Sequence, residues 1–418
     1  METKTQVTSL GRITVIDALR GFALLGVLIV HMMQHFGIFS FGNFGVERTP
    51  VFSFLDDSVQ WLMRNVFMGK FINIFAFLFG MSFFIQIDRA RRRGVDFRRR
   101  FVWRMVILLF IGLVGTAYFG HEILTIYAVF GVILVFLSPL RQWVLIALAA
   151  ILIFGAPRAV LSEYDRITYV APETEQPEQR PMPNFNRQMP EPSIANTVKS
   201  NYNSAFTSKL EYQFGINSRG YVTMALFILG FVVGRSRFFE YVHIRKRRNY
   251  VLFGIFAVAA YAVTKIAGLI APDGITMFWL QPRDLTPTML IYSGLNDLAS
   301  VLYSGAIAMG FICLFFVPGV GRVLDFLSPY GRLGLTNYEM QGLIGCLLFS
   351  PWALGGIFGI WSATELFLLA LLIYLVQVCV SKLWLTYFIY GPFEWFWRTA
   401  TYLKPQPFLK SKSRLTAA

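Results

Sequence analysis

The stretch RITVIDALRGFALLGVLIVHMMQHFG, from Arg12 to Gly37, is long and apolar enough to span a bilayer, yet it carries Asp17, Arg20, His31 and His35. Successive residues of a helix are rotated by about 100°, so these four side chains fall within an arc of about 60°. Ionisable groups at membrane depth are costly unless they face a protein interior or a wet cavity. The stretch therefore predicts a first transmembrane helix with one polar stripe, which other helices enclose.

The composition indicates a polytopic α-helical membrane protein. The 418 residues are 56% hydrophobic and only 15% charged, with a mean hydropathy of +0.55. Continuous apolar runs of about 20 residues argue against a β-barrel. The net charge of +15 comes from basic residues in short loops between apolar runs, as the positive-inside rule requires, so we expect no nucleic-acid partner. We expect one integral membrane domain over residues 1–418.

Ten apolar runs are predicted to span the membrane: 13–36, 66–86, 102–119, 122–139, 142–157, 221–238, 249–270, 290–316, 333–355 and 361–387. With this count, the arginine-rich loops after the second, sixth and eighth spans and the basic tail all fall on one side. The positive-inside rule then makes both termini cytoplasmic. The arginine clusters also suit anionic lipid headgroups or a phosphorylated cosubstrate, an alternative that stays open.

Two segments are expected outside the membrane. Residues 158–220 are polar and Pro-rich, which predicts a PPII-like or partly disordered external segment that acts either as a lid over an external opening or as a passive surface loop. The tail 391–418 opens with GPFEWFWR, which suits a short helix in the cytoplasmic interface. The three cysteines lie inside apolar runs and are expected to be packing residues, not metal ligands or disulfides.

The polar stripe of the first helix has two ends with different chemistry. Asp17 and Arg20 lie three residues apart and can form a structural ion pair, and Arg20 is also able to hold a phosphate or carboxylate. His31 is about 17 Å further along the axis, in the outer half of the membrane. Its imidazole can exchange a proton near neutral pH, as a general base must. With His35 one turn later but no third ligand, a metal site is not expected.

Further polar groups occur at three other places. His121 and Glu122 form a turn on the outer side, with Tyr127 one or two turns later, and Glu122 is placed to orient an imidazole or a substrate. An ordinary solvated turn is the alternative there. The other places hold groups that either line a cavity or join helices: Lys70 of GKFINIFAFLFG, and Asn337, Tyr338, Glu339 and Gln341 of GRLGLTNYEMQ.

Five motifs together resemble those of the bacterial YeiB-like family, known as domain of unknown function 418: IDALRGFALLGVL, GKFINIFAFLFG, HEILTIYAVFG, GRLGLTNYEMQ and GPFEWFWR. That family is similar to the acyltransferase family 3 proteins and to lysosomal heparan-α-glucosaminide N-acetyltransferase, which share a multi-helix transmembrane fold. The family 3 pattern has Asp-x-x-Arg followed by His eleven residues after the Arg, as Asp17, Arg20 and His31 are spaced here. Many YeiB-like members carry Asn where this chain has His31, and Asp where it has Glu122.

The resemblance implies a transmembrane acyltransferase that uses acyl-CoA or acetyl-CoA from the cytoplasm, without a metal. We assign His31 and Glu122 as catalytic and the following residues to substrate binding: Asp17, Arg20, His35, Lys70, His121, Tyr127, Asn337, Tyr338 and Gln341. Expected partners are membrane lipids and a small-molecule, glycan or lipid acceptor on the outer side of the bacterial cytoplasmic membrane. A homodimer is left open, as are two other functions, a proton-coupled or lipidic-solute transporter and a non-catalytic scaffold.

Overall fold

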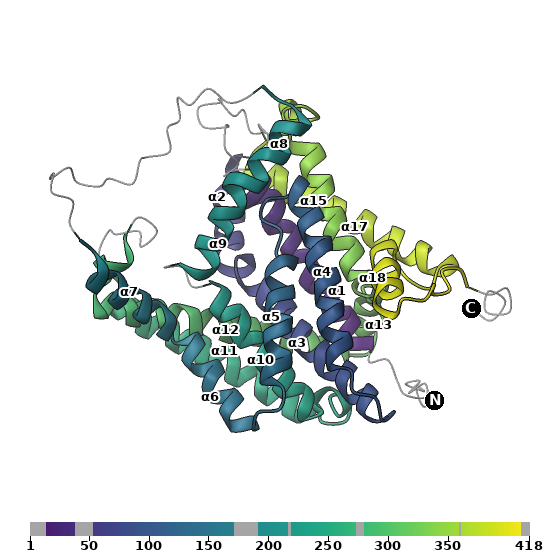
Figure 1. The fold of residues 1–418 in the computed structure, drawn as a ribbon, viewed down its shortest axis with the longest axis horizontal. Coiled ribbons are helices and arrows are strands. Elements are labelled where there is room, and N and C mark those ends of the chain that lie inside the picture. The colour runs from purple at the N-terminus through teal and green to yellow at the C-terminus, as the bar shows by residue number, and fades with distance from the viewer. Residues whose placement is uncertain are drawn as a thin grey trace.

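The computed structural model describes residues 14–37, 53–170, 191–215, 219–272, 280–358 and 361–410. This part of the chain is almost entirely helical and contains no β-strand; the β-type pairing in it is an isolated bridge between Phe388 and Leu409. The prediction of an all-α protein is therefore confirmed. Figure 1 shows the helices gathered into one bundle.

The elements of the N-terminal half are α1 (Thr14–Val30), the π-helix η1 (His31–Gly37), α2 (Ser53–Leu62), the π-helix η2 (Met63–Phe67), α3 (Lys70–Arg91), α4 (Arg98–Tyr118), α5 (Leu124–Leu137), α6 (Gln142–Ile153), α7 (Ala156–Thr168), α8 (Ile194–Ser200), the π-helix η3 (Asn201–Ala205) and α9 (Phe206–Phe214). The elements of the C-terminal half are α10 (Arg219–Arg235), the 3₁₀-helices η4 (Phe238–Glu240) and η6 (Pro282–Asp284), α11 (Lys246–Leu269), α12 (Pro287–Phe315), α13 (Val320–Asp325), α14 (Ser328–Arg332), α15 (Gly334–Phe349), α16 (Gly355–Phe358), α17 (Ala363–Tyr387) and α18 (Pro392–Tyr402).

Six helical segments in the described residues are long and apolar enough to cross a membrane, which makes this a multi-pass membrane protein: Thr14–Phe36, Phe54–Arg91, Arg98–Tyr118, Lys246–Leu269, Pro287–Phe315 and Ala363–Tyr387. The number rises to eight if each of two bent pairs is one span, α6 with α7 and Ile194–Phe214 with α10. Ten spans were predicted. Two of those ten coincide with shorter helices, the 14-residue α5 and the 16-residue α15, because the apolar runs extend beyond the helices themselves.

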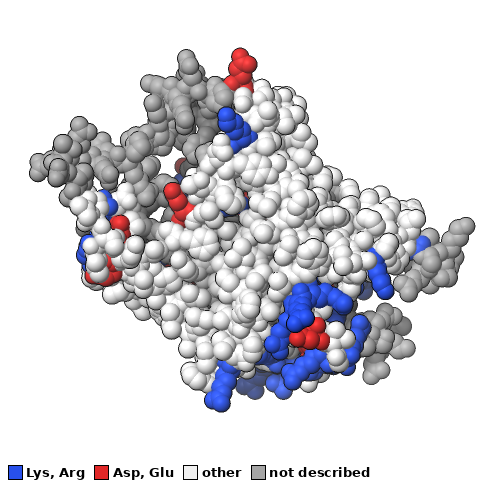
Figure 2. All heavy atoms as spheres, in the orientation of Figure 1, with Lys and Arg blue, Asp and Glu red and all other residues white. Residues whose placement is uncertain are grey.

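The distribution of charge over the surface supports this membrane assignment. In Figure 2 the Lys and Arg side chains gather mainly at one end of the molecule, and the middle of the same face is almost free of charge. The basic end includes the loop between α3 and α4, where Arg91 to Arg93 and Arg98 to Arg100 are exposed. On α11, large apolar side chains such as Val258 and Leu269 are exposed. An uncharged apolar belt next to a basic end is typical of a membrane protein.

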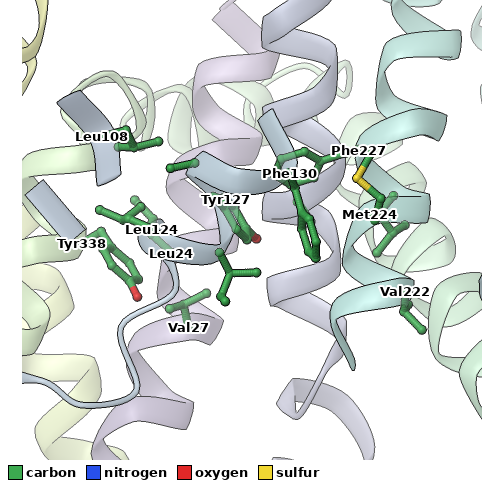
Figure 3. Packing of buried hydrophobic residues seen from close by; sticks show 14 of the residues in the cluster. Leu24, Val27, Leu108, Leu124, Tyr127, Phe130, Val222, Met224, Phe227 and Tyr338 are labelled. Atoms are coloured by element: carbon green, nitrogen blue, oxygen red, sulfur yellow. The ribbon is translucent and has the colours of Figure 1, made fainter. Parts of the chain in front are cut away.

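Helix α1 lies in the interior of the bundle. It packs against α3, α14, α15 and α17, and its residues Leu24, Leu28 and Ile29 are completely buried. Figure 3 shows Leu24 and Val27 among side chains from α5 and α15, including Tyr127 and Tyr338. The ionisable side chains of α1 therefore face other helices, as their cost in lipid requires.

The backbones of α3 and α10 touch where the two helices cross. A Cβ on Gly80 would lie 2.0 Å from the carbonyl oxygen of Phe227, and a Cβ on Gly230 would lie 2.0 Å from that of Phe77. Side chains do not fit in such a gap, so glycine is required at both positions. Membrane helices commonly use small residues in this way, because close backbone approach increases the van der Waals contact between them.

The described residues of the segment 158–220 are largely helical, so the expectation of a PPII-like or partly disordered segment is wrong for them. The segment contains most of α7 and all of α8, η3 and α9. Arg158 of α7 forms a 2.9 Å ion pair with Asp297 of α12. Asn201 and Tyr202 of η3 donate hydrogen bonds to backbone carbonyls of α4. Some of the polar side chains of this segment thus bind the bundle, while many others are exposed. The most Pro-rich part, residues 171–190, lies outside the described residues.

The expected short helix after the last span is α18, and it secures α15. Glu394 of α18 accepts hydrogen bonds from the backbone N–H groups of Leu335 (2.7 Å) and Thr336 (3.0 Å) and from the Thr336 hydroxyl (2.6 Å). The carboxylate thus caps the N-terminus of α15, whose unpaired N–H groups favour an anion. Burial raises the pKa of Glu394, and the hydrogen bonds from Thr336 and Leu335 oppose the rise. GPFEWFWR and GRLGLTNYEMQ are therefore structural partners.

The helix crossing at Gly80 generates a prediction with a matched control. Gly80→Ala should destabilise the protein by about 1–3 kcal/mol, because the new methyl group meets the backbone of α10. In Gly254→Ala on α11 the added Cβ has no neighbour within 4 Å, so stability should stay equal or rise through helix propensity. The melting temperatures of the two purified variants in detergent measure the difference, and equal values would contradict the crossing.

Candidate functional site

The first helix changes its geometry at the residue expected to be catalytic. The α-helical hydrogen bonding ends at Val30, and His31 opens the π-helix η1. Phe36 of η1 packs against Gly345 of α15, where a Cβ would lie only 2.2 Å from the ring. This contact holds the wider turn in place. π-Helical turns are rare and occur frequently at functional sites.

Three histidines form a row from the interior to the surface. His31 is 6% exposed, His35 is half-buried and His121, in the turn between α4 and α5, is exposed. The ring centroids of His31 and His35 are 5.8 Å apart, and the His35 ring stacks on His121 at 4.4 Å. Phe119 lies 4.7 Å from His31 and 5.9 Å from His35, between centroids. The structure thus brings together three residues that the sequence placed on two segments.

His31 combines burial with unused hydrogen-bonding capacity. Its ring packs against Phe119 and, at 5.7 Å, against Tyr338 of α15. No described group hydrogen-bonds to its buried Nδ1 atom. Most buried polar atoms have a partner, and an exception often marks a functional position. In the described part of the chain, no three His, Cys, Asp or Glu side chains converge closely enough to hold a metal ion.

Glu122 is buried beside the histidine row and paired with a lysine. It is 1% exposed and accepts hydrogen bonds from the backbone N–H groups of Leu124 and Thr125, so it caps the start of α5. Lys209 of α9 lies 3.7 Å from Glu122 Oε2 and donates to the Thr125 hydroxyl at 3.0 Å. Lys209 is itself only 4% exposed. A buried ion pair of this kind requires such additional hydrogen bonds.

A second buried carboxylate approaches the same place from α15. Glu339 is 2% exposed and accepts a hydrogen bond from the Tyr118 hydroxyl, while no described group hydrogen-bonds to its Oε1 atom. A Cβ on Gly115 of α4 would lie 2.9 Å from Glu339 Oε2 and 3.1 Å from Glu122 Cγ. Gly115 therefore leaves the space that both carboxylates enter. Among the described residues, Lys209 forms an ion pair with Glu122, whereas the contact found for Glu339 is the hydrogen bond from Tyr118.

Asp17 and Arg20 form a separate group at the other end of α1. Their side chains are 2.9 Å apart, as their spacing predicted. Arg20 also donates to the Ser82 hydroxyl of α3 (3.1 Å) and to the carbonyl of Gly331 in α14 (3.4 Å). A Cβ on Gly331 would lie 1.8 Å from the carbonyl oxygen of Asp17, so α1 and α14 are in backbone contact there. The pair joins three helices, which favours the structural alternative.

Asn337 and Gln341 also serve helix packing. Asn337 donates to the Tyr330 carbonyl and to the Ser381 hydroxyl of α17, both at 3.0 Å. Gln341 donates to the Leu24 carbonyl (3.2 Å) and to the Tyr330 hydroxyl (2.9 Å). These bonds connect α15 to α1, α14 and α17. Interhelical hydrogen bonds of this kind are common in membrane bundles.

Three further predicted residues lie in different surroundings. Lys70 donates to the Arg64 carbonyl at 3.1 Å, away from the histidine row. Tyr127 is completely buried against Phe227, with ring centroids 4.9 Å apart, and no described group hydrogen-bonds to its hydroxyl (Figure 3). The hydroxyl of Tyr338, in contrast, accepts a hydrogen bond from the backbone N–H of Ile123, beside Glu122, at 3.0 Å. Of these three residues, Tyr338 contacts the site.

Sequence reasoning missed three members of the site, Lys209, Gly115 and Tyr118, and it described Glu339 only as a group that either lines a cavity or joins helices. The sequence carries no clear signal for Lys209. The buried residues of α9 are Lys209 and Gln213, whereas its apolar residues Leu210 and Tyr212 are exposed, so apolar periodicity does not mark the buried face.

Comparisons with known proteins support a family assignment without an activity. Residues 233–404 match the family model described as "Protein of unknown function (DUF418)". The chain is 27% identical to the "Uncharacterized protein YxaH" of Bacillus subtilis (strain 168), with 96% of each chain covered. It is 24% identical to the "Uncharacterized protein YeiB" of Escherichia coli (strain K12), covering 96% of this chain and 98% of that one. No solved structure matches. The predicted resemblance to the YeiB-like family, domain of unknown function 418, is therefore confirmed, by the family match over residues 233–404 and by the similarity to YxaH and YeiB.

Proposed function

We propose that this protein is an integral-membrane acyltransferase of the bacterial cytoplasmic membrane. It moves an acyl group from cytoplasmic acyl-CoA or acetyl-CoA to a hydroxyl or amine on a small-molecule, glycan or lipid acceptor at the outer side. In this proposal the chain crosses the membrane ten times in an acyltransferase-like fold, with both termini cytoplasmic. The short helices α5 and α15 complete two of the crossings together with their flanking residues.

The observation that carries the proposal is the buried His31 side chain, to whose Nδ1 atom no described group hydrogen-bonds. A general base needs a nitrogen that no protein group already occupies. His31 would take the proton from the acceptor as the acceptor oxygen or nitrogen forms its bond to the thioester carbon. The carbon–sulfur bond then breaks, and the same proton passes to the departing CoA thiolate. The row through His35 to the exposed His121 supports access for an acceptor from the surface opposite the basic end.

The surroundings of Glu122 favour His31 over Glu122 as the base. The carboxylate of Glu122 already caps α5 and pairs with Lys209 at 3.7 Å. Removing it from these contacts would leave a buried ammonium group without its counter-ion, at a cost of several kcal/mol. Glu122 thus acts as a positioning residue that holds α5, α9 and the following turn around the histidine row.

One observation favours the transporter alternative. The helical segment Ile194–Phe214, which supplies Lys209, meets α10 at a bend of 63°. Broken helices of this kind surround the substrate sites of many transporters, and buried ionisable groups mark proton pathways. Uptake of a solute into proteoliposomes under a pH gradient, without turnover of acyl-CoA, would support this function instead.

His31 gives the direct test of the acyltransferase. His31→Gln should lower the rate of acyl-CoA turnover by about 10²-fold or more, the usual contribution of a general base. The matched control is His243→Gln, since His243 lies on the basic loop before α11, far along the chain from the row. The release of free CoA by purified protein in nanodiscs measures both rates. Wild-type turnover in His31→Gln would refute the assignment.

Variants of Lys209 distinguish the acyltransferase function from the transporter alternative. Lys209→Met should destabilise the fold by about 3–5 kcal/mol, because buried carboxylates lose their counter-ion. The double variant Lys209→Met/Glu122→Gln should recover much of that loss, since the Glu122 charge is removed as well. Lys199→Met on exposed α8 is the control. If the double variant keeps the wild-type rate of acyl transfer, the Lys209–Glu122 pair has a structural role. If the double variant instead loses uptake that the wild-type protein shows under a pH gradient, the transporter function is supported. Melting temperature and both activities are the measurements.

A further inference from the structure

A cavity of about 380 Å³ opens at the basic end of the molecule, separate from the histidine row. Its walls come from the start of α1, from the adjacent helices α13 and α14, and from α17, so three segments distant in the sequence meet there. Figure 1 places α13 close to the start of the described chain, at the lower right of the bundle. The cavity therefore lies on the side that the positive-inside rule assigns to the cytoplasm.

Cations predominate in this cavity. Arg322, Arg332 and Lys382 line it, against two carboxylates, Asp17 and Asp325. Both carboxylates are already engaged within the protein. Asp17 pairs with Arg20 at 2.9 Å, and Asp325 accepts a hydrogen bond from Ser328 at 2.6 Å. With three cations against two carboxylates, the cavity lining carries an excess of positive charge.

The cavity also has an apolar wall beside the exposed cations. Lys382 lies over the ring of Phe326, 4.4 Å from its centroid, and Arg322 and Lys382 are both exposed. Val323, on the exposed side of α13, is 71% exposed. A short helix that presents apolar residues and an arginine suits the membrane interface. A ligand with an anionic head and an organic body would match both surfaces.

We propose that this cavity binds a phosphate group, carried either by an anionic lipid or by a soluble CoA-type molecule. Arg322 and Arg332 suit a phosphate because the planar guanidinium donates two parallel hydrogen bonds to its oxygens. Lys382 adds a third positive charge from α17. The cavity does not involve the histidine row, so phosphate binding stands independently of acyl transfer.

The test is binding, measured without turnover. Purified protein is titrated with free CoA by calorimetry, and the retention of phosphatidylglycerol against phosphatidylcholine is measured by native mass spectrometry. The variant Arg322→Gln/Lys382→Gln should lose binding by about tenfold or more for the phosphate source that the cavity uses. The matched control is Lys246→Gln/Arg247→Gln, which removes one Lys and one Arg exposed at the same end of the molecule.

The outcomes separate the two sources. A loss for CoA alone assigns the cavity to a soluble ligand, and a loss for phosphatidylglycerol alone assigns it to a lipid headgroup. The charge-preserving variant Arg322→Lys/Lys382→Arg should keep most of the binding, which distinguishes lost charge from a damaged fold. Unchanged binding in the first variant, or an equal loss in the control, would overturn the proposal.

Discussion

The need to pair ionisable side chains in apolar surroundings governs this structure. Helix α1 and the π-helix η1 that continues it carry four such groups, and the two ends of this segment differ in how the groups are paired. At the basic end, Asp17 and Arg20 neutralise each other and reach into α3 and α14. At the other end, His31 is buried among aromatic rings. The charges of Asp17 and Arg20 are paired with each other, whereas the His31 imidazole keeps a nitrogen to which no described group hydrogen-bonds. We therefore assign the proposed chemistry to His31.

Close approach of helix backbones makes these pairings possible. Glycines stand where α1 meets α14, where α3 crosses α10, and where two carboxylates approach α4. At Gly115 the missing side chain gives room to Glu122 and Glu339 together. Because lipid provides little hydrophobic force between helices, such tight contacts and interhelical hydrogen bonds hold the bundle. The positions of the polar groups thus depend on residues that carry no chemistry of their own.

The two ends of the molecule have different proposed roles, phosphate binding at the basic end and proton transfer at the histidine row. The basic end has a cavity with cations from three helices, and the opposite end has a row of imidazoles that reaches the surface. A transferase that takes its donor from one compartment and its acceptor from the other needs such a division. The relatives YxaH and YeiB carry no assigned activity in their names, so the proposed function rests on the chemistry of these groups.

The sequence by itself determined the helical membrane class, the basic end, the Asp17–Arg20 pair and the resemblance to the YeiB-like family, because these depend on composition, periodicity and local spacing. It also selected His31, His35, His121 and Glu122, since ionisable residues are conspicuous among apolar ones. The tertiary structure alone decided that Lys209 neutralises Glu122 and that Glu339 joins them, because those contacts link segments more than 80 residues apart. It also decided that Asn337 and Gln341 hold helices together. Local pattern reveals where a polar group is costly, but only the packing of distant helices reveals which partner offsets that cost.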